Sequence, residues 1–452
     1  MRGYYYDAEL ALSGGNLKTI YEEAITIECS SGFVDLGQEK TFTFTTEDDS
    51  GEEITEGLTY TLQGVYMNGS TVSATYYDWS ETTDPNKVKF KTTIPVAGKY
   101  TIVMNVLYKG TTYSKTQKIT VKEPWAPTST PSLLPSGTTG SAGTSAKYLY
   151  LGDWPQTIKA SNVEIDESKT KTQGAFTYYL GDDGDYYVKC MENAYETGYS
   201  YSDGGIITES SGQSYKYFKV EPIKWRVLTE NYNGTGKWLL LAENILSVDV
   251  YYDNYIDNRT ISGSTVYPGN YLHSRIRAYL NGIAYNKEGA ENSEFVDHGF
   301  LQTAFTADLQ SRIITTEVIN DADSTDDIDG WHIKADADGS THNEDYTCAN
   351  TNDKVFLLSV REAREPDFGF SSIQDADTVR QKAPTDYAKC NQAKAESGIG
   401  EWWLRSPFFD YYSIVRVVYT NGDAQSNNGS SVYKYVNQGG IGIVPAICID
   451  AP

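Results

Sequence analysis

Residues 400–407 read GEWWLRSP, and residues 441–449 read IGIVPAICI. Both runs are mostly apolar, which predicts two buried strands. The segment between them differs, since 17 of the 31 residues from Phe408 to Gln438 are Tyr, Phe, Asn, Ser or Gly. Tyr gives a large amphipathic contact at low entropic cost, and the small polar residues form hydrogen bonds adaptably. The sequence therefore predicts a recognition surface held between two core strands, and an aromatic core is the competing interpretation.

The length and charge of the chain restrict its organisation and its partners. A chain of 452 residues predicts two or three domains. The net charge of −24 disfavours nucleic acid and anionic membrane surfaces, because both need clustered Lys and Arg. No apolar run approaches the ~20 residues that span a bilayer, and no signal peptide is visible. The 37 Tyr and 39 Gly residues favour a surface or secreted β-rich protein over a cytosolic enzyme.

The cysteines do not fix the compartment. Their odd number excludes a complete disulfide framework, and no CxxC pair occurs. They are Cys29, Cys190, Cys348, Cys390 and Cys448.

The first hundred residues predict a β-sandwich that follows an introductory segment, residues 1–24, with weak helical potential over 17–24. From residue 25 to residue 123, about seven short alternating strands recur at roughly 10–15-residue spacing. The clearest are residues 41–45, 59–62, 88–92, 100–106 and 116–121. The step Gly98-Lys99-Tyr100 resembles the approach to a late strand in immunoglobulin-like (Ig-like) spacer domains. The cysteine pair of antibody domains is missing.

A linker and a second domain follow. Of the 24 residues from 124 to 147, 17 are Pro, Ser, Thr or Gly, which predicts a partly stiffened coil. Residues 148–452 predict strands at 148–152 and 354–359, and a hairpin of residues 223–228 and 237–242. Helices are expected over 274–281, with Gly282 as the stop signal, and near 302–309.

Several blocks of this second domain, in this order, resemble one known family. They are KWRVL at 224–228, LLLAE at 239–243, SRIRAYLN at 274–281, KVFLLS at 354–359, PTDYA at 384–388, WWLRSP at 402–407 and GIVPAI at 442–447. The set resembles bacterial C-type lectin fold domains of the formylglycine-generating-enzyme-like branch. It is most similar to the variable proteins of diversity-generating retroelements, as in Treponema, which are surface lipoproteins. Relatives commonly carry Arg where this chain has Val444, so the contact of that Arg is not carried over.

The resemblance implies an α+β fold class. It implies a C-type lectin-like fold over 148–452, with a mixed, mostly antiparallel sheet, two helices and long insertions, after an all-β Ig-like sandwich. It also implies a non-enzymatic receptor or adhesin on the extracellular face of a bacterial outer membrane. The expected partner is a protein or glycan on another cell or host, with no nucleic acid and no cofactor. Membrane contact is expected only through an N-terminal lipid anchor outside this chain, whose leader is absent.

In such retroelements, template adenines become random bases, so Asn codons yield many residue types but never Lys, Gln, Glu, Met or Trp. The resemblance thus places a variable segment at about 405–438. Many of its positions hold residue types that mutated Asn codons can encode, and these are the predicted ligand-binding residues. They are Phe408, Phe409, Asp410, Tyr411, Tyr412, Ser413, Ile414, Tyr419, Asn427, Asn428, Ser430, Ser431, Tyr433 and Tyr435. Mutated Asn codons cannot encode Gln or Lys, so the residues at Gln425, Lys434 and Gln438 are expected not to vary. On an extended segment Phe409, Tyr411 and Ser413 would point outward.

The alternative function is a formylglycine-generating-enzyme-like oxidoreductase on the same fold, with Cys390 and Cys448 as its only candidate thiols. No recognisable motif surrounds them. The Asp-rich runs at 321–339 and 182–185 lack EF-hand spacing and are expected to be solvated loops. A zinc site from His332, His342 and Cys348 matches no common spacing, so no metal is expected.

Overall fold

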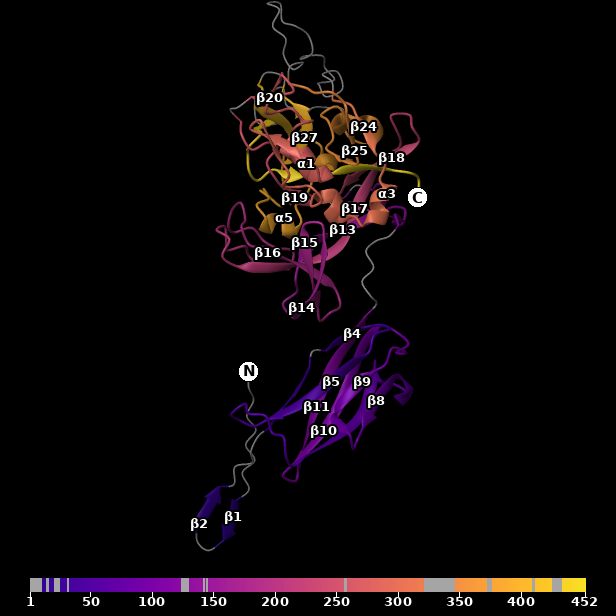
Figure 1. Ribbon diagram of the computed structural model, residues 1–452, viewed down its shortest axis with the longest axis vertical. Coiled ribbons are helices and arrows are strands. Elements are labelled where there is room, and N and C mark those ends of the chain that lie inside the picture. Colours follow the sequence, from indigo (N-terminus) through magenta and orange to yellow (C-terminus); the bar gives the residue numbers. More distant parts are fainter. Residues whose placement is uncertain are drawn as a thin grey trace, which may run out of the picture. The chain divides into compact units, whose positions relative to one another are not determined.

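The computed structural model describes residues 10–13, 16–19, 25–30, 32–122, 130–140, 143, 145–255, 258–320, 346–371, 376–408, 411–424 and 433–452. The chain is α+β and mainly β-sheet, as predicted, and it divides into two compact units (Figure 1). Residues 1–125 make up most of the first unit, and residues 126–452 make up most of the second.

The first unit contains two sheets over one core. One sheet has the order β4 (Phe33–Asp35), β11 (Thr111–Lys122), β10 (Gly98–Tyr108), β6 (Leu58–Met67), β7 (Ser70–Thr71). The other has the order β3 (Thr26–Cys29), β5 (Lys40–Glu47), β9 (Asp84–Phe90), β8 (Tyr77–Ser80), with a 3-10 turn at Ala74–Tyr76. A separate hairpin joins β1 (Leu10–Ser13) to β2 (Asn16–Thr19), so the helical potential expected from residue 17 is wrong for the residues described there.

Alternation along the strands builds the core of this unit. In β10, Tyr100, Ile102, Met104 and Val106 are buried, whereas the residues between them are more exposed. This period of two is what puts one face of a strand against a core. The hydroxyl of Tyr100 donates a hydrogen bond to the carbonyl of Val96 at 2.8 Å, so this buried Tyr is satisfied by the chain four residues upstream.

The second unit is built on two larger sheets. One has the order β14 (Ile165–Gln173), β15 (Phe176–Gly181), β16 (Tyr186–Met191), β17 (Tyr215–Tyr232), β18 (Lys237–Ala242), β31 (Ala446–Ile449), β26 (Val355–Phe356), and β13 (Tyr148–Ile158) joins it through β17. The other has the order β19 (Ser247–Val248), β30 (Gly442–Ile443), β27 (Trp402–Pro407), β28 (Ile414–Val418), β29 (Tyr433–Tyr435). Short hairpins pair β20 (Arg259–Ile261) with β21 (Ser264–Val266), β22 (Tyr285–Lys287) with β23 (Ala290–Asn292), and β24 (Thr316–Val318) with β25 (Thr351–Asp353).

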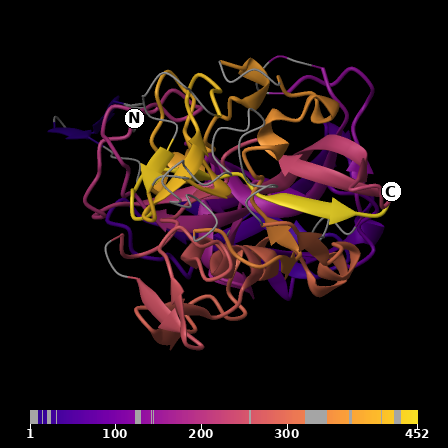
Figure 2. The same ribbon diagram turned by 90° about the horizontal axis from the view of Figure 1, so that it is seen from above.

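The first predicted core run lies in the smaller of these two sheets, and the second run contributes a strand to each of them. GEWWLRSP supplies β27, which pairs with β28 and β30. The closing run continues from β30 into β31, which lies alongside β18 (Figure 2). The last residues of the chain therefore join the sheet that carries the tyrosine-rich segment to the larger sheet.

The helices are short. They are α1 (Arg275–Asn281), α2 (Phe300–Ala304), α3 (Ala307–Arg312) and α5 (Asp386–Cys390), with 3-10 turns at Glu362–Arg364, Pro366–Phe368 and Thr378–Arg380. The helix predicted over 274–281 is confirmed as α1: Ser274 caps it by accepting from the Arg277 amide, and Gly282 ends it at φ 64°. The helix expected near 302–309 is two helices, α2 and α3, separated by Phe305 and Thr306. No helix in the described residues is long and apolar enough to cross a membrane.

Part of the predicted linker is ordered. The strand β12 (Ser132–Leu133) pairs with β13, and the Lys224 ammonium donates to the carbonyl of Thr139 at 2.8 Å. The predicted partly stiffened coil therefore does not describe residues 132–133, whose backbone pairs with β13. Residues 123–129 lie outside the described residues.

We expect Met104→Ala to destabilise the first unit by about 2–5 kcal/mol, because it leaves a cavity in a core position that is fully buried. Leu107→Ala, on the same strand but 41% exposed, is the control and should cost about 1 kcal/mol or less. Urea denaturation followed by intrinsic fluorescence measures both. Equal losses for the two variants would contradict this account of β10.

Candidate ligand-binding surface

The strand β27 is fixed by its tryptophans. Trp402 and Trp403 are fully buried, as predicted for this motif. The indole N–H of Trp402 donates to the carbonyl of Arg380 at 3.1 Å, and that of Trp403 donates to the carbonyl of Asp249 at 3.0 Å. A buried indole usually needs such a partner. Each Trp therefore fastens β27 to a segment far away in sequence.

An ion pair fixes the next part of the same strand. The buried guanidinium of Arg405 meets the carboxylate of Glu362 and donates to the carbonyl of Leu357 at 2.7 Å. Burial acts to raise the pKa of Glu362, but Arg405, together with hydrogen bonds from the Tyr232 hydroxyl and the Ser359 amide, lowers that pKa overall. The neighbouring Ser406 hydroxyl accepts the amide of Val360 at 3.0 Å. The 357–362 segment thus depends on β27 for its position.

A second ion pair fixes β29. The Lys434 ammonium lies 3.0 Å from the carboxylate of Glu401, which is 1% exposed. The ammonium and the carboxylate lie within hydrogen-bond distance, but their angles do not form a hydrogen bond. The attraction between them is therefore that of an ion pair. The same ammonium lies 5.2 Å from the ring centre of Tyr419. Lys434 therefore has a structural role, which gives a physical reason to retain the residue at that position.

Residues Tyr411 to Ile414 form a turn, so the expected strand-like alternation does not apply to these described residues. The amide of Ile414 donates to the carbonyl of Tyr411 at 3.2 Å, and the amide of Phe408 donates to the carbonyl of Ile414 at 2.9 Å. Ser413 and Ile414 are both buried. Ile414 begins the fully buried strand β28, and the carbonyl of Ser413 accepts a hydrogen bond from the amide of Val436. Their predicted role as direct ligand contacts does not fit these positions.

The large hydrophobic side chains that are exposed in this region are tyrosines. Tyr411 is 51% exposed, Tyr435 is 47% exposed, and Tyr255, from a distant segment, is 41% exposed. The rings of Tyr255 and Tyr435 lie 5.5 Å apart, and those of Tyr411 and Tyr412 are stacked at 6.2 Å. Together with their ring neighbours they form what we call the tyrosine surface: Tyr255, Tyr267, Tyr346, Phe408, Tyr411, Tyr412, Tyr433 and Tyr435.

Phe408 and Tyr433 form a further ring pair of the tyrosine surface. Their ring centres lie 4.4 Å apart, and the guanidinium of Arg416 lies 4.7 Å from the ring of Phe408. Arg416 is opposite Tyr433 in the β28–β29 register. Tyr433 and Tyr435 share one side of β29, and Lys434 between them points to the other side. The rings of Phe408 and Tyr433 are therefore held by the buried guanidinium of Arg416 and by the pairing of β28 with β29.

Three members of this surface are missed by sequence reasoning. Tyr267 lies 5.0 Å from Tyr346 and 6.0 Å from Tyr412, measured between ring centres, and Tyr255 contacts β29. For Tyr255 and Tyr267 the sequence signal is the repeated tyrosine in the 251–271 region, and this pattern by itself predicts buried core residues. The fold brings these segments together.

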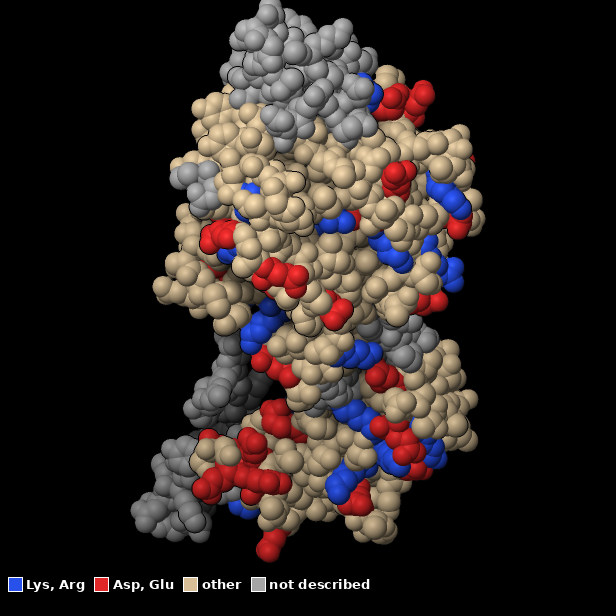
Figure 3. Space-filling view, turned by 45° about the horizontal axis from the view of Figure 1, so that its top comes forward, with Lys and Arg blue, Asp and Glu red and all other residues tan. Residues whose placement is uncertain are grey.

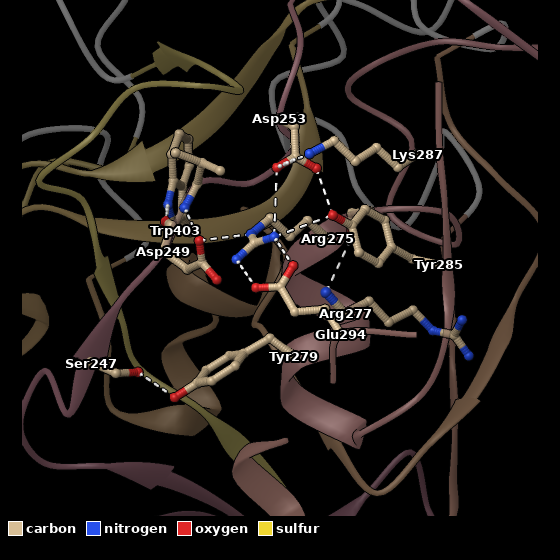
Figure 4. Close-up of polar contacts among 12 residues, drawn as sticks. Ser247, Asp249, Asp253, Arg275, Arg277, Tyr279, Tyr285, Lys287, Glu294 and Trp403 are labelled. Atoms are coloured by element: carbon tan, nitrogen blue, oxygen red, sulfur yellow. Dashed lines mark hydrogen bonds and ion pairs between the residues drawn. The ribbon is translucent and has the colours of Figure 1, made fainter. Parts of the chain in front are cut away.

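A charged cluster holds the segment that carries Tyr255 (Figure 4). The guanidinium of Arg275, on α1, bonds the carboxylates of Asp249 at 2.9 Å and Glu294 at 2.7 Å, and it lies 3.5 Å from that of Asp253. Burial raises the pKa of Asp249 although Arg275 opposes the shift. Since the backbone of Asp249 also accepts from Trp403, this cluster ties the loop to β27.

The predicted ligand-binding residues thus separate into groups. Tyr411 and Tyr435 are exposed, whereas Phe408, Tyr412, Tyr419 and Tyr433 are partly buried. Six others lie outside the described residues: Phe409, Asp410, Asn427, Asn428, Ser430 and Ser431.

The part of the chain that the structure describes holds no group of three or more His, Cys, Asp or Glu side chains placed to bind a metal ion. His332, His342 and the acidic run 321–339 lie outside it, and Asp185 of the other acidic run pairs with Lys219 at 2.6 Å. On the face in Figure 3, basic and acidic residues are interspersed among uncharged ones.

Comparison with known families gives one finding. Residues 235–451 match the model of DUF6273, a domain of unknown function. No curated protein matches the chain. The matched range runs from the turn before β18 to just past the end of β31. It therefore includes every member of the tyrosine surface and the strands β27, β30 and β31 that the two core runs supply.

We expect Lys434→Met to destabilise the second unit by about 3–5 kcal/mol, because it leaves the Glu401 carboxylate buried without its counter-charge. Adding Glu401→Met should restore most of that loss, since apolar residues of similar volume replace such pairs at little cost. Urea denaturation of the two variants tests this. An unchanged unfolding midpoint for the single variant would show that the pair is dispensable.

Proposed function

We propose that this chain is a non-enzymatic recognition protein, of receptor or adhesin type, that binds a protein or glycan through the tyrosine surface. The observation that carries the proposal is the exposure of Tyr255, Tyr411 and Tyr435 above strands held by buried ion pairs and indole hydrogen bonds. Exposed rings cost free energy in water unless a partner covers them, and Tyr is enriched among the residues that dominate binding energies.

Rigidity of the base supports this function. A side chain that is already held in its bound orientation loses less entropy on binding. Tyr435 lies on β29, and Tyr411 lies on the tight turn before β28; β29 pairs with β28, which in turn pairs with β27. Recognition residues are commonly placed this way, on loops over a firm scaffold.

We further propose that the second unit has a C-type lectin-like fold of the formylglycine-generating-enzyme-like branch, and that the first unit is an Ig-like spacer. The family blocks at 402–407 and 442–447 supply the buried strands β27, β30 and β31, which supports the former. The two sheets over one core and the hydrogen bond of Tyr100 to the chain upstream support the latter.

In this proposal a retroelement diversifies the segment at about 405–438, and the protein is displayed on the extracellular face of a bacterial outer membrane through a lipid anchor. Exposed Tyr411 and Tyr435 are reachable from Asn codons, and the structural residue Lys434 is not. DNA sequencing around the gene tests it. A near-copy of this segment with adenines at the differing positions, beside a reverse transcriptase gene, is the expected result, and its absence would remove the diversification proposal.

The oxidoreductase alternative has less support. Cys448 lies on β31 against β18, whereas Cys390 ends α5 and bonds the Met191 carbonyl. No interaction joins these two thiols among the residues described. Cys390 and Cys448 therefore do not form the thiol pair that this alternative needs.

We expect Tyr411→Ala and Tyr435→Ala each to weaken ligand binding at least about tenfold, since exposed aromatic anchors commonly contribute 1–2 kcal/mol or more. The full chain is first screened on a glycan array and against displayed extracellular domains, and variants are then compared by biolayer interferometry. Each substitution should change the free energy of unfolding by less than about 1 kcal/mol, as exposed positions do.

The matched control is Tyr215→Ala, an exposed tyrosine on β17 outside the tyrosine surface. It should leave binding unchanged. Wild-type affinity in both Tyr411→Ala and Tyr435→Ala would place the ligand elsewhere.

A further inference from the structure

Two cysteines far apart in sequence meet at one carbonyl group. Cys190 is on β16, and Cys390 is the last residue of α5. The sulfur of Cys190 lies 3.5 Å from the carbonyl oxygen of Met191, and the sulfur of Cys390 lies 3.7 Å from the same oxygen. Both thiols therefore converge on a single point between the strand and the helix.

The backbone around this point is already joined. The amide of Asn193, just after β16, donates to the carbonyl of Cys390 at 2.9 Å, and Asn193 forms a parallel bridge with Asn391. A disulfide requires α-carbons within about 7 Å and side chains that approach each other. Because the two segments are held together here, the two side chains approach the same point, as such a bond requires.

The two thiols differ in access and acidity. Cys390 is fully buried, and Cys190 is partly exposed. A hydrogen bond from Cys390 lowers the pKa of Cys190, whereas the same bond and burial raise the pKa of Cys390. The thiolate is the nucleophile in thiol–disulfide exchange, so the accessible sulfur is also the reactive one.

The remaining cysteines have the opposite character. Burial raises the pKa of Cys29 and of Cys348 to about 11 and that of Cys448 to about 12. At neutral pH these three thiols stay protonated and react slowly. They serve as internal controls for selective chemistry at the pair.

We propose that Cys190 and Cys390 form a dithiol that low-molecular-weight disulfides oxidise to a disulfide, joining β16 to α5. The Cys190 thiolate attacks one sulfur of oxidised glutathione, the S–S bond breaks, and one glutathione thiolate leaves. Cys390 then loses its proton to solvent and attacks the Cys190 sulfur, which expels the second glutathione. Two protein thiols are oxidised, and one glutathione disulfide is reduced to two thiols.

The bond would close a long loop that contains β17, β18 and α1–α3, so it restricts the unfolded chain strongly. It would also match the oxidising surroundings of a surface protein, although it does not depend on the ligand proposed above.

The test treats the purified full chain with oxidised glutathione and digests it without reductant for mass spectrometry. The expected product is a cross-linked peptide pair containing Cys190 and Cys390, with the mass of two hydrogens lost and a higher melting temperature than the reduced chain. Wild-type protein that keeps one glutathione without forming this cross-link, or that cross-links another cysteine instead, would overturn the proposal.

The variants separate the two steps. Cys390→Ser and Cys390→Ala, which keep the side chain small enough for the buried site, should both stop at one glutathione attached to Cys190. Cys190→Ser should gain neither glutathione nor a cross-link, and Cys29→Ser should behave as the wild type. A Cys190→Ser chain that is still oxidised at Cys390 would contradict the assignment of the attacking thiol. Ligand binding is read separately, with the Tyr411 and Tyr435 variants.

Discussion

Two opposite charges buried in one short motif are the constraint on which the second unit depends. Glu401 and Arg405 lie at the start and in the middle of the GEWWLRSP motif, and water is excluded from both. A charge in such surroundings is tolerated only with a partner, so each demands a second segment: Lys434 for Glu401, and Glu362 for Arg405. Together with the two indole hydrogen bonds, these pairs set where β29, the 357–362 segment and the Asp249 loop must lie.

This anchoring separates residues that the fold needs from residues that it does not. Ile414 and Ser413 are enclosed by the strands, so changing them changes the core. Tyr411 lies three residues before Ile414 and Tyr435 pairs with it, yet each of these tyrosines leaves about half of its surface exposed to solvent. A segment with this division can accept different exposed side chains while its backbone stays in place, which is the physical requirement for a diversified or adaptable binding surface.

Much of the local structure could be predicted from sequence, because it depends on neighbours along the chain. Alternation predicted β5, β6, β9, β10 and β11, and a Ser cap with a Gly stop predicted α1. The errors arise where distant residues decide. Ser413 was placed outside because a strand was assumed where Tyr411 and Ile414 form a turn, and residues 130–140 were taken as coil although β13 pairs with part of them.

By itself, the sequence determined that the chain is mainly β, that residues 402–407 and 441–449 are core, and that a tyrosine-rich segment lies between them. Only the tertiary structure decided which tyrosines share a surface, since Tyr255, Tyr267 and Tyr346 come from other loops. It alone also brought Cys190 to Cys390 and Glu362 to Arg405. Periodicity and capping record the preferences of adjacent residues, whereas these pairings arise from burying charges and strands against remote segments, which no local pattern encodes.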